Sequence, residues 1–337
     1  MGLISAILFG AATPASKAML DSLNAFQLAG LLYLGAAIAM GPVAIKEKYR
    51  HKMFSIASPD IRRLLGAIIF GGILGPVFLL WGLRLASASS VSLWLNLEMV
   101  ATLILGWLFF KDHLGRFGIL GAAGILFASM LLGLGDKTAA PEAGFLIGLA
   151  CLCWGLDNHF TALIDGITPS QSTMWKGIFA GTTNFLIGSI TASGAPTIKN
   201  LALALLLGGS SYGISIALYI KSAQQIGASR SQMIFSTSPF FGVALSALFL
   251  GESLSAIQYA SAILIAVSLL ALIRDKHEHL HTHQELAHAH EHTHDDGHHK
   301  HVHDEEYPDM RHSHWHEHQS GEHSHPHWPD LHHRHRH

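Results

Sequence analysis

The sequence predicts an all-α integral membrane protein of ten transmembrane helices in two inverted five-helix repeats, followed by a disordered His-rich C-terminal tail. Two observations lead to this fold class. The stretch from Ala88 to Ile125 recurs 140 residues later, as Ala228 to Ile265. The chain also has a mean hydropathy of +0.34 and only 13% charged residues, although everything after Lys276 is strongly polar. The part before Lys276 must therefore be very apolar.

The two copies share identical residues as well as a similar hydropathy pattern. Eight positions of the first copy meet identical residues in the second, and Asp112 meets Glu252 in the short polar break between two apolar runs. Two helical halves of this kind are typical of secondary transporters. The identical positions are Ala88, Ser89, Leu105, Leu108, Phe109, Leu114, Ala122 and Ile125.

The apolar segments have the length of membrane spans, because about 20 residues cross a hydrocarbon core of about 30 Å. We number them helices 1 to 10. Five helices per half is an odd number, so the second half enters the membrane from the opposite side and the repeat is inverted. We predict repeats at 1–138 and 139–275 and a cytoplasmic tail at 276–337. The predicted spans are 2–20, 24–45, 61–83, 87–110, 114–135, 143–164, 170–193, 199–221, 227–250 and 254–274.

Basic residues predict the orientation. If the N-terminus is cytoplasmic, the inner connections carry twelve Lys and Arg residues and the outer ones carry four. This split favours both termini inside, in a bacterial-type inner or plasma membrane, with lipid as the surrounding partner. Helix 1 lacks the basic start of a signal peptide, and Pro14 and Lys17 interrupt it, so we expect it to be retained.

Short motifs in both halves resemble those of a known protein family. The Phe9-Gly10 and Trp154-Gly155 turns come early in each half, and the segments 105–114 and 245–254 each end in an acidic residue and a new helix. Over residues 2–274 the chain resembles the EamA-type repeat of the drug/metabolite transporter superfamily. The resemblance implies a central cavity formed mainly by helices 1 to 4 and 6 to 9, with helices 5 and 10 as outer scaffold. It also implies transport of small organic metabolites, often amino acids or amphipathic amines.

Two acidic residues break the apolarity inside the spans. Glu98 lies near the middle of helix 4 and Asp157 lies well within helix 6. An ionisable group at bilayer depth costs about 2.5 to 3.5 kcal/mol on insertion scales, so it normally faces protein or water and often has a role. We predict that both bind the solute or a proton. The alternative is that Glu98 only bonds to neighbouring polar groups and holds helices together.

Helical spacing adds partners to each acid. Trp94, Glu98 and Thr102 are four residues apart on helix 4, and on helix 6 a similar stripe consists of Cys153 or Trp154, then Asp157 and Thr161. Each stripe offers an aromatic wall, a carboxylate and a hydroxyl, which suits an amphipathic or cationic solute. The remaining predicted substrate-binding residues are Asn96, Lys176 and Tyr212.

Other features have structural interpretations. Lys176 supplies either a counter-charge in the cavity or an anchor at the membrane surface. For His159, a role as a ligand or proton relay is less favoured than a structural one. Gly115, Gly118, Gly121 and Gly124 recur every three residues on helix 5 and predict a close seam, within one chain or at a homodimer contact.

The tail predicts metal binding. Between His277 and His337 stand 23 of the 26 histidines, mostly as His-x-His, and alternate residues of an extended chain project to one side. Such imidazoles suit Ni²⁺, Zn²⁺, Cu²⁺ or Co²⁺. With almost no apolar content the tail should be disordered. The predicted ligands are His277, His279, His281, His283, His312, His314, His316, His318, His323 and His325.

Three roles of the tail stay open: a metal buffer or sensor that regulates the carrier, a metal donor to a pore, or a charge switch. From Lys276 onward, five Lys and Arg stand against twelve Asp and Glu, a charge of −7 that 23 protonations would turn into +16. The switch would operate near the imidazole pKa of about 6.5.

Together these features predict a secondary transporter of small organic metabolites that works by alternating access, in the direction of export, with a regulatory tail. The alternative is a divalent transition-metal transporter (Ni, Co or Zn) or a metal-sensing membrane protein. Phosphate loops, nucleophile elbows and catalytic triads do not occur in the sequence, so we expect neither an enzyme nor a primary pump. We expect no required cofactor and no nucleic-acid partner.

Calorimetry on a peptide of residues 276–337 should detect several equivalents of Ni²⁺ or Zn²⁺ at neutral pH, because imidazole is then largely unprotonated and free to coordinate. The same peptide with its histidines replaced by serine is the control. Absence of heat from the native peptide at neutral pH would refute the metal-binding prediction.

Overall fold

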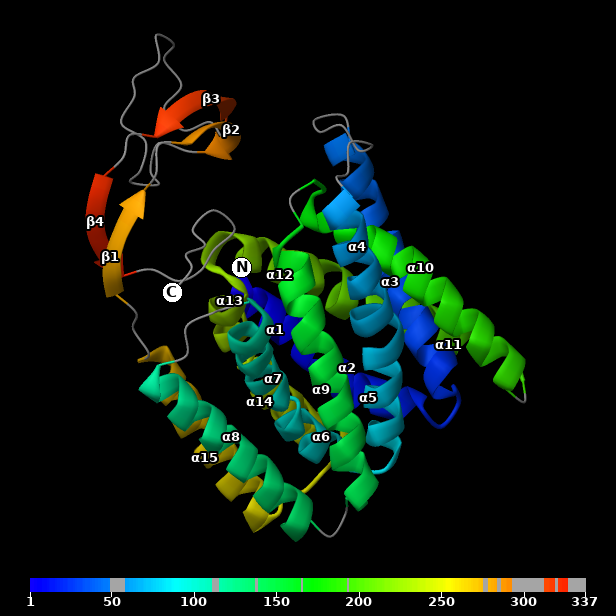
Figure 1. The fold of residues 1–337 in the computed structure, drawn as a ribbon. Coiled ribbons are helices and arrows are strands. Elements are labelled where there is room, and N and C mark those ends of the chain that lie inside the picture. The colour runs from blue at the N-terminus through cyan, green and yellow to red at the C-terminus, as the bar shows by residue number, and fades with distance from the viewer. Residues whose placement is uncertain are drawn as a thin grey trace. The chain divides into compact units, whose positions relative to one another are not determined.

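The computed structural model describes most of the helical part and four short stretches of tail backbone (Figure 1). The helical unit is Met1–Asp275, and Lys276–His327 form a second unit. The described residues are 1–48, 58–110, 115–136, 139–164, 166–192 and 194–274, with the backbone alone of 278–283, 286–292, 312–318 and 321–326.

Each predicted span of the first half is found as one helix or as a helix in pieces. Helix 1 is α1 (Gly2–Gly10) with α2 (Ala12–Met19), helix 2 is α3 (Ala25–Lys48), and helix 5 is α8 (Arg116–Gly135). Helix 3 consists of α4 (Ser58–Gly66), η1 (Ala67–Leu74) and α5 (Gly75–Arg84). Helix 4 consists of α6 (Ala88–Trp94), α7 (Leu97–Leu105) and η2 (Gly106–Phe110).

The second half follows the same plan. Helices 6, 7 and 10 are α9 (Pro141–Ala162), α10 (Pro169–Thr191) and α15 (Ala256–Ile273). Helix 8 consists of α11 (Ile198–Leu207), η3 (Gly208–Ile214) and α12 (Ser215–Ile226), and helix 9 of α13 (Ala228–Phe235) and α14 (Ser238–Leu250).

Nine helical stretches within the described ranges are long and apolar enough to cross a membrane. The remaining predicted span, helix 7, is α10, which has 23 residues but a more polar sequence than the other spans. Its polar side chains Gln171, Thr173, Lys176 and Asn184 are buried in protein. Such side chains lower the hydropathy of a helix without exposing charge to lipid, which explains why α10 differs from the other nine.

Two of the helix interruptions recur at equivalent positions of the two halves. The π-helices η1 and η3 interrupt helices 3 and 8, and their last residues, Leu74 and Ile214, are 140 positions apart. Helices 4 and 9 break next to Asn96 and Ser236, again 140 positions apart. The offset found in the sequence therefore also relates the irregular backbone of the two halves.

Local chemistry accounts for both breaks. The side-chain amide of Asn96 donates to the backbone oxygen of Leu93 at 3.2 Å, a local bond that competes with the helix. Pro239 stands in the first turn of α14, where a residue without an N–H is tolerated. Both breaks lie among buried residues of the bundle rather than against lipid, as irregular backbone at membrane depth requires.

The helix α3 is packed tightly from two sides. A side chain at Gly30 would overlap the backbone of Phe185 in α10, and one at Gly35 would overlap the carbonyl oxygen of Leu205 in α11. Glycine lets the backbones approach to contact distance, which strengthens dispersion contacts between membrane helices. One wall of the central bundle therefore depends on glycine at these positions.

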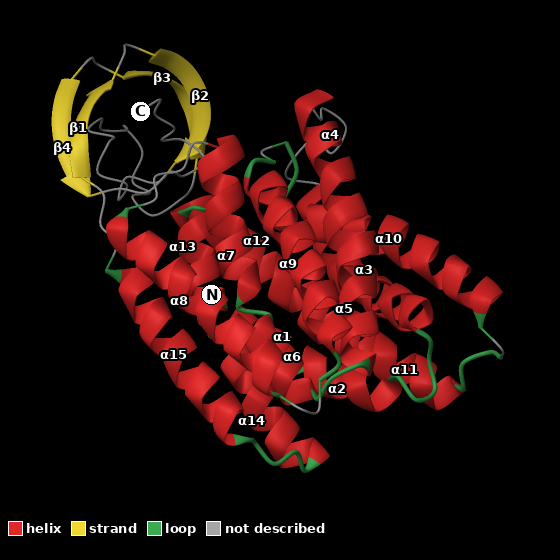
Figure 2. Ribbon diagram, turned by 60° about the horizontal axis from the view of Figure 1, so that its bottom comes forward, coloured by secondary structure: helices red, strands yellow, loops and turns green. Residues whose placement is uncertain are grey.

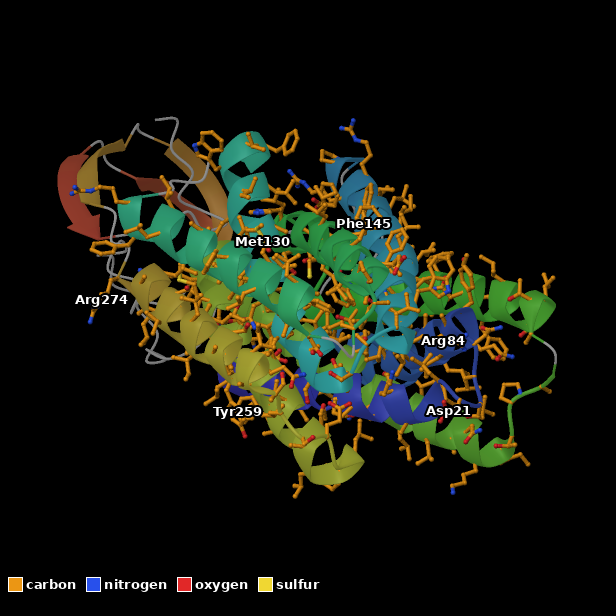
Figure 3. All side chains as sticks on the ribbon, turned by 90° about the horizontal axis from the view of Figure 1, so that it is seen from below. Asp21, Arg84, Met130, Phe145, Tyr259 and Arg274 are labelled. Carbon is orange, nitrogen blue, oxygen red and sulfur yellow. The ribbon has the colours of Figure 1, made fainter. Side chains whose placement is uncertain are left out.

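The predicted glycine seam joins α8 to α15, which lie side by side (Figures 1 and 2). Side chains at Gly121 and Gly124 would overlap Leu272 and Ser268 of α15. The seam therefore lies within one chain at these two positions. Met130 and Tyr259 of this pair are 63% and 56% exposed (Figure 3), as expected for side chains that face lipid.

In the tail, β1 (Glu278–His283) pairs antiparallel with β4 (Gly321–Pro326), and β2 (Leu286–His292) with β3 (His312–His318). The sequence predicts no backbone pairing for these four segments. Their side chains and the other tail residues lie outside the described part, where disorder stays a prediction.

Substitution of Gly35 by alanine should lower the stability of the bundle by about 1–3 kcal/mol, because the new methyl group must push apart two packed backbones. Gly41→Ala on the same helix is the matched control, since a side chain there has open space and alanine favours the helix by roughly 1 kcal/mol. Apparent melting temperatures of the purified variants in detergent measure both effects. Equal melting temperatures for the two variants would contradict the packing argument.

Candidate functional site

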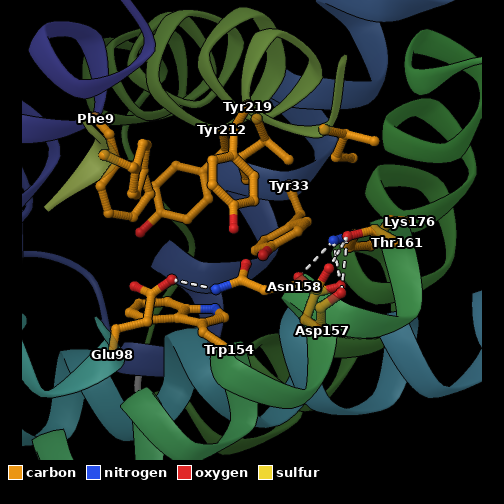
Figure 4. A pocket seen from close by; sticks show the side chains of 13 residues that line it. Phe9, Tyr33, Glu98, Trp154, Asp157, Asn158, Thr161, Lys176, Tyr212 and Tyr219 are labelled. Atoms are coloured by element: carbon orange, nitrogen blue, oxygen red, sulfur yellow. Dashed lines mark hydrogen bonds and ion pairs between the residues drawn. The ribbon is translucent and has the colours of Figure 1, made fainter. Parts of the chain in front are cut away.

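A cavity lies in the interior of the bundle, where helices of both repeats meet (Figure 4). The space among its side chains amounts to about 420 Å³, a volume that includes space open to the surroundings. Its lining comes from α1, α3, α7, α9, α10, η3, α12 and α13. The lining residues are Phe9, Tyr33, Glu98, Trp154, Asp157, Asn158, Thr161, Lys176, Tyr212, Ile216, Tyr219, Ile220 and Phe235.

An ion pair between Asp157 and Lys176 forms one wall. The Lys176 Nζ donates to both carboxylate oxygens of Asp157, at 2.7 and 2.6 Å. Both side chains are almost fully buried. In such surroundings each charge needs the other, because a buried unpaired charge is far more costly than a paired one. The structure thus places Lys176 as the counter-charge of Asp157 rather than as a membrane anchor.

The backbone of helix 3 completes this wall. The π-helix η1 presents the carbonyl oxygen of Gly71, which accepts bonds from the Tyr33 hydroxyl at 2.5 Å and the Trp154 indole N–H at 3.1 Å. A side chain at position 71 would overlap the Asp157 carboxylate, so only glycine fits there. A π-helical turn frees backbone groups for such contacts and is frequent at functional sites.

Glu98 forms the opposite wall, in the first turn of α7 just after the break in helix 4. One of its carboxylate oxygens accepts a bond from the Asn158 side-chain amide at 2.9 Å. The same amide nitrogen lies 3.1 Å from Thr102 Oγ1 and 3.2 Å from Gln232 Oε1. Asn158 thereby ties Glu98 of the first repeat to Gln232 of the second.

The predicted stripe on helix 4 does not hold in the structure. Trp94 is buried outside the cavity, where its indole N–H donates to the backbone oxygen of Ser129 at 3.0 Å. Asn96 does not line the cavity either, and Thr102 acts only through Asn158. The helix break between Trp94 and Leu97 is the reason, because it removes the regular turn on which four-residue spacing depends.

The stripe on helix 6 is brought to the cavity as a unit, because α9 is unbroken. Trp154, Asp157 and Thr161 all line it, and the Thr161 hydroxyl donates to the backbone oxygen of Asp157 at 2.8 Å. Tyr212 lines it as well. His159 lies outside, with Nε2 bonded to the Thr102 carbonyl at 2.9 Å.

Seven lining residues are not among the predicted substrate-binding residues: Phe9, Tyr33, Asn158, Ile216, Tyr219, Ile220 and Phe235. Asn158 carried a usable signal, since it is an amide next to Asp157 within an apolar span. The aromatic residues carried no such signal, because an aromatic ring in a membrane helix can equally well face lipid, another helix or a cavity.

No metal site is formed by the part of the chain that the structure describes, since no group of three or more His, Cys, Asp and Glu side chains comes together there. The ten predicted tail ligands have side chains outside that part. Metal binding by the tail therefore stays a prediction.

Comparisons with known proteins agree with this architecture. The EamA-like transporter family model matches residues 1–134 and 143–274. An uncharacterized transporter of Methanothermobacter thermautotrophicus is 26% identical over 286 residues, which cover 79% of this chain and 83% of the relative. A solved crystal structure of a protein, 15% identical, superposes with a TM-score of 0.60 over 80% of this chain and 94% of its own. This last likeness concerns the fold alone.

Substitution of Lys176 by methionine should destabilise the protein by about 3–5 kcal/mol, because it leaves the buried Asp157 carboxylate without its partner. The double variant Asp157→Asn with Lys176→Met should regain most of this loss, since it contains no unpaired charge. Apparent melting temperatures in detergent, arranged as a double-mutant cycle, test the coupling. Additive effects of the two substitutions would refute it.

Proposed function

This chain belongs to the EamA-like transporter family, and we propose that it carries a small organic solute through the cavity between its two repeats. Members of this family are multi-pass membrane transporters, so the chain is one too. The observation that carries the proposal is the cavity itself. It is lined by both repeats and holds Glu98 and the Asp157–Lys176 pair inside an otherwise aromatic and apolar wall.

The shape of this site suits an amphipathic solute such as an amine or an amino acid. Aromatic rings offer a surface for an apolar body, and a few polar groups fix its orientation, as in most small-molecule sites. Binding deep inside the bundle, at the meeting of two inverted repeats, is the arrangement used for alternating access.

Alternating access requires contacts between the repeats that can separate. The Glu252 carboxylate accepts bonds from the Ala88 N–H, the Ser89 N–H and the Ser89 hydroxyl, at 2.8, 2.8 and 2.6 Å. Close by, the Gln258 side-chain amide donates to Ser90 Oγ at 2.8 Å and to Asp136 Oδ2 at 3.3 Å. We infer that these bonds between the repeats keep the bundle closed at the end where Ala88 and Glu252 lie. They would break when that end opens.

Direction and regulation are part of the proposal. We expect export, with both termini in the cytoplasm, and a tail that binds Ni²⁺, Zn²⁺, Cu²⁺ or Co²⁺ and regulates the carrier. Uptake into inside-out vesicles, compared with right-side-out vesicles, tests the direction. Metal titration of full-length and tail-less carriers tests the regulation.

Transport of a divalent metal is the alternative. The His-rich tail favours it, whereas the cavity offers only Glu98 and the Lys176-bound Asp157 as anionic ligands. Borderline metals such as Ni²⁺ and Zn²⁺ prefer imidazole or thiolate partners, and neither side chain lines the cavity. The organic solute is therefore the stronger candidate.

In proteoliposomes, a screen of amines and amino acids should identify a solute whose flux falls at least about tenfold in Glu98→Gln, because removal of a buried charge partner costs 2 kcal/mol or more. Glu142→Gln is the matched control, since Glu142 is an exposed acid in the first turn of α9. Its flux should equal that of the native protein.

Two outcomes would contradict this proposal. One is a solute flux that is unchanged in both Glu98→Gln and Asp157→Asn. The other is a flux of Ni²⁺ or Zn²⁺, followed with a metal-sensitive dye, that survives deletion of residues 276–337 and vanishes in Glu98→Gln.

A further inference from the structure

The charges of the cavity do not balance. Of its thirteen lining residues two are acidic, Glu98 and Asp157, and one is basic, Lys176. Lys176 is already bonded to both oxygens of Asp157. Glu98 accepts bonds from the neutral side-chain amides of Asn158 and Gln232, and among the described residues it forms no ion pair. A carboxylate at this depth therefore lacks a cation.

Two hydroxyls in the same cavity also lack partners. Tyr212 and Tyr219 are 0% and 5% exposed, and neither phenolic oxygen has a hydrogen-bond partner among the described residues. Both point from the side of helix 8 toward the wall that holds Glu98 and Asn158 (Figure 4). Buried polar groups are nearly always hydrogen-bonded. Two such hydroxyls facing an uncompensated carboxylate indicate the place of a ligand's polar head.

Aromatic rings continue from this point. Phe9 lies 5.4 Å from Tyr212 and 5.0 Å from Phe235 between ring centroids, and Phe235 lies 5.0 Å from Tyr219. The indole of Trp154 stands edge-on to Phe9 at 6.1 Å. Such a cluster attracts a cation through the faces of its rings and also accommodates an apolar or aromatic body.

We propose that this cavity binds a protonated primary or secondary amine that carries an apolar or aromatic body and no carboxylate. The ammonium N–H groups donate to Glu98 and to the oxygens of Tyr212 and Tyr219, and the body packs on Phe9 and Phe235. This inference rests on the proposed function and narrows its solute class.

An amino acid fits less well, because the lining residues include no unpaired cation for its carboxylate. The charge of Lys176 is already paired with that of Asp157, and the Asn158 amide is engaged by Glu98, Thr102 and Gln232. The carboxylate would also lie beside Glu98, and like charges side by side are strongly unfavourable. A quaternary ammonium fits less well for a different reason, since it has no N–H to donate.

The test compares three ligands that share one body: 2-phenylethylamine, phenylalanine and trimethyl(2-phenylethyl)ammonium. Calorimetry on the full-length carrier in lipid nanodiscs should give one amine per chain, with phenylalanine at least about tenfold weaker. Glu98→Gln should weaken the amine by at least about 30-fold. Tyr212→Phe and Tyr219→Phe should each weaken the amine while leaving the trimethylated ligand nearly unchanged.

Matched controls are available outside the cavity. Tyr259→Phe removes a phenol from an exposed position of α15, and Glu142→Gln removes an exposed carboxylate from α9. Both should bind 2-phenylethylamine as the native protein does. Equal elution volume and helical content of every variant show that the fold is retained.

Three results would overturn the inference: phenylalanine binding as tightly as the amine, full amine affinity in Glu98→Gln, or no binding of the amine at all. In each case the flux screen decides separately about the proposed function. If the screen shows that the protein transports amino acids through this cavity, the proposed function holds and only the inference about the amine is refuted.

Discussion

Charged groups and backbone polar groups in a membrane interior must find partners within the protein, and the rest of this structure follows from that requirement. The Asp157–Lys176 pair shows its most demanding form, since both charges are buried and each bonds the other. The same requirement applies to the backbone at Gly71. Its carbonyl oxygen, freed by the π-helix, accepts hydrogen bonds from Tyr33 and Trp154. The apolar outer surface can then consist of helices that need nothing from lipid except contact. Close glycine packing of α3 and of α8 with α15 holds the scaffold around this polar interior.

Much of the fold could be predicted from the sequence, since hydropathy and the 140-residue duplication place the spans, although not the backbone interruptions within them. The apolar pattern records which segments lie in lipid, and the repeat records their arrangement. Only α10 departs from the pattern, because its polar side chains face protein. A tally of hydropathy does not register which side of a helix those residues occupy.

The site was predictable where the helix was regular. On α9 the spacing of Trp154, Asp157 and Thr161 brought all three to the cavity, whereas on helix 4 the break next to Asn96 turned Trp94 away from Glu98. A break of this kind depends on tertiary partners for the freed backbone, which spacing does not contain. The aromatic lining was hidden for a related reason, because its rings are assembled from helices far apart in the sequence.

The neutral Asp157–Lys176 pair has an electrical consequence. Because the pair carries no net charge, an ionised Glu98 alone gives the empty cavity a charge of one electron. The proposed monovalent ammonium would cancel it, so the binding site would be neutral when the loaded carrier changes conformation and charged when the empty carrier returns. The membrane potential then acts on the return of the empty protein, with about 2.3 kcal/mol per 100 mV for a charge that crosses the whole field. Voltage could thus set the pace and sense of the cycle without any ion site other than Glu98.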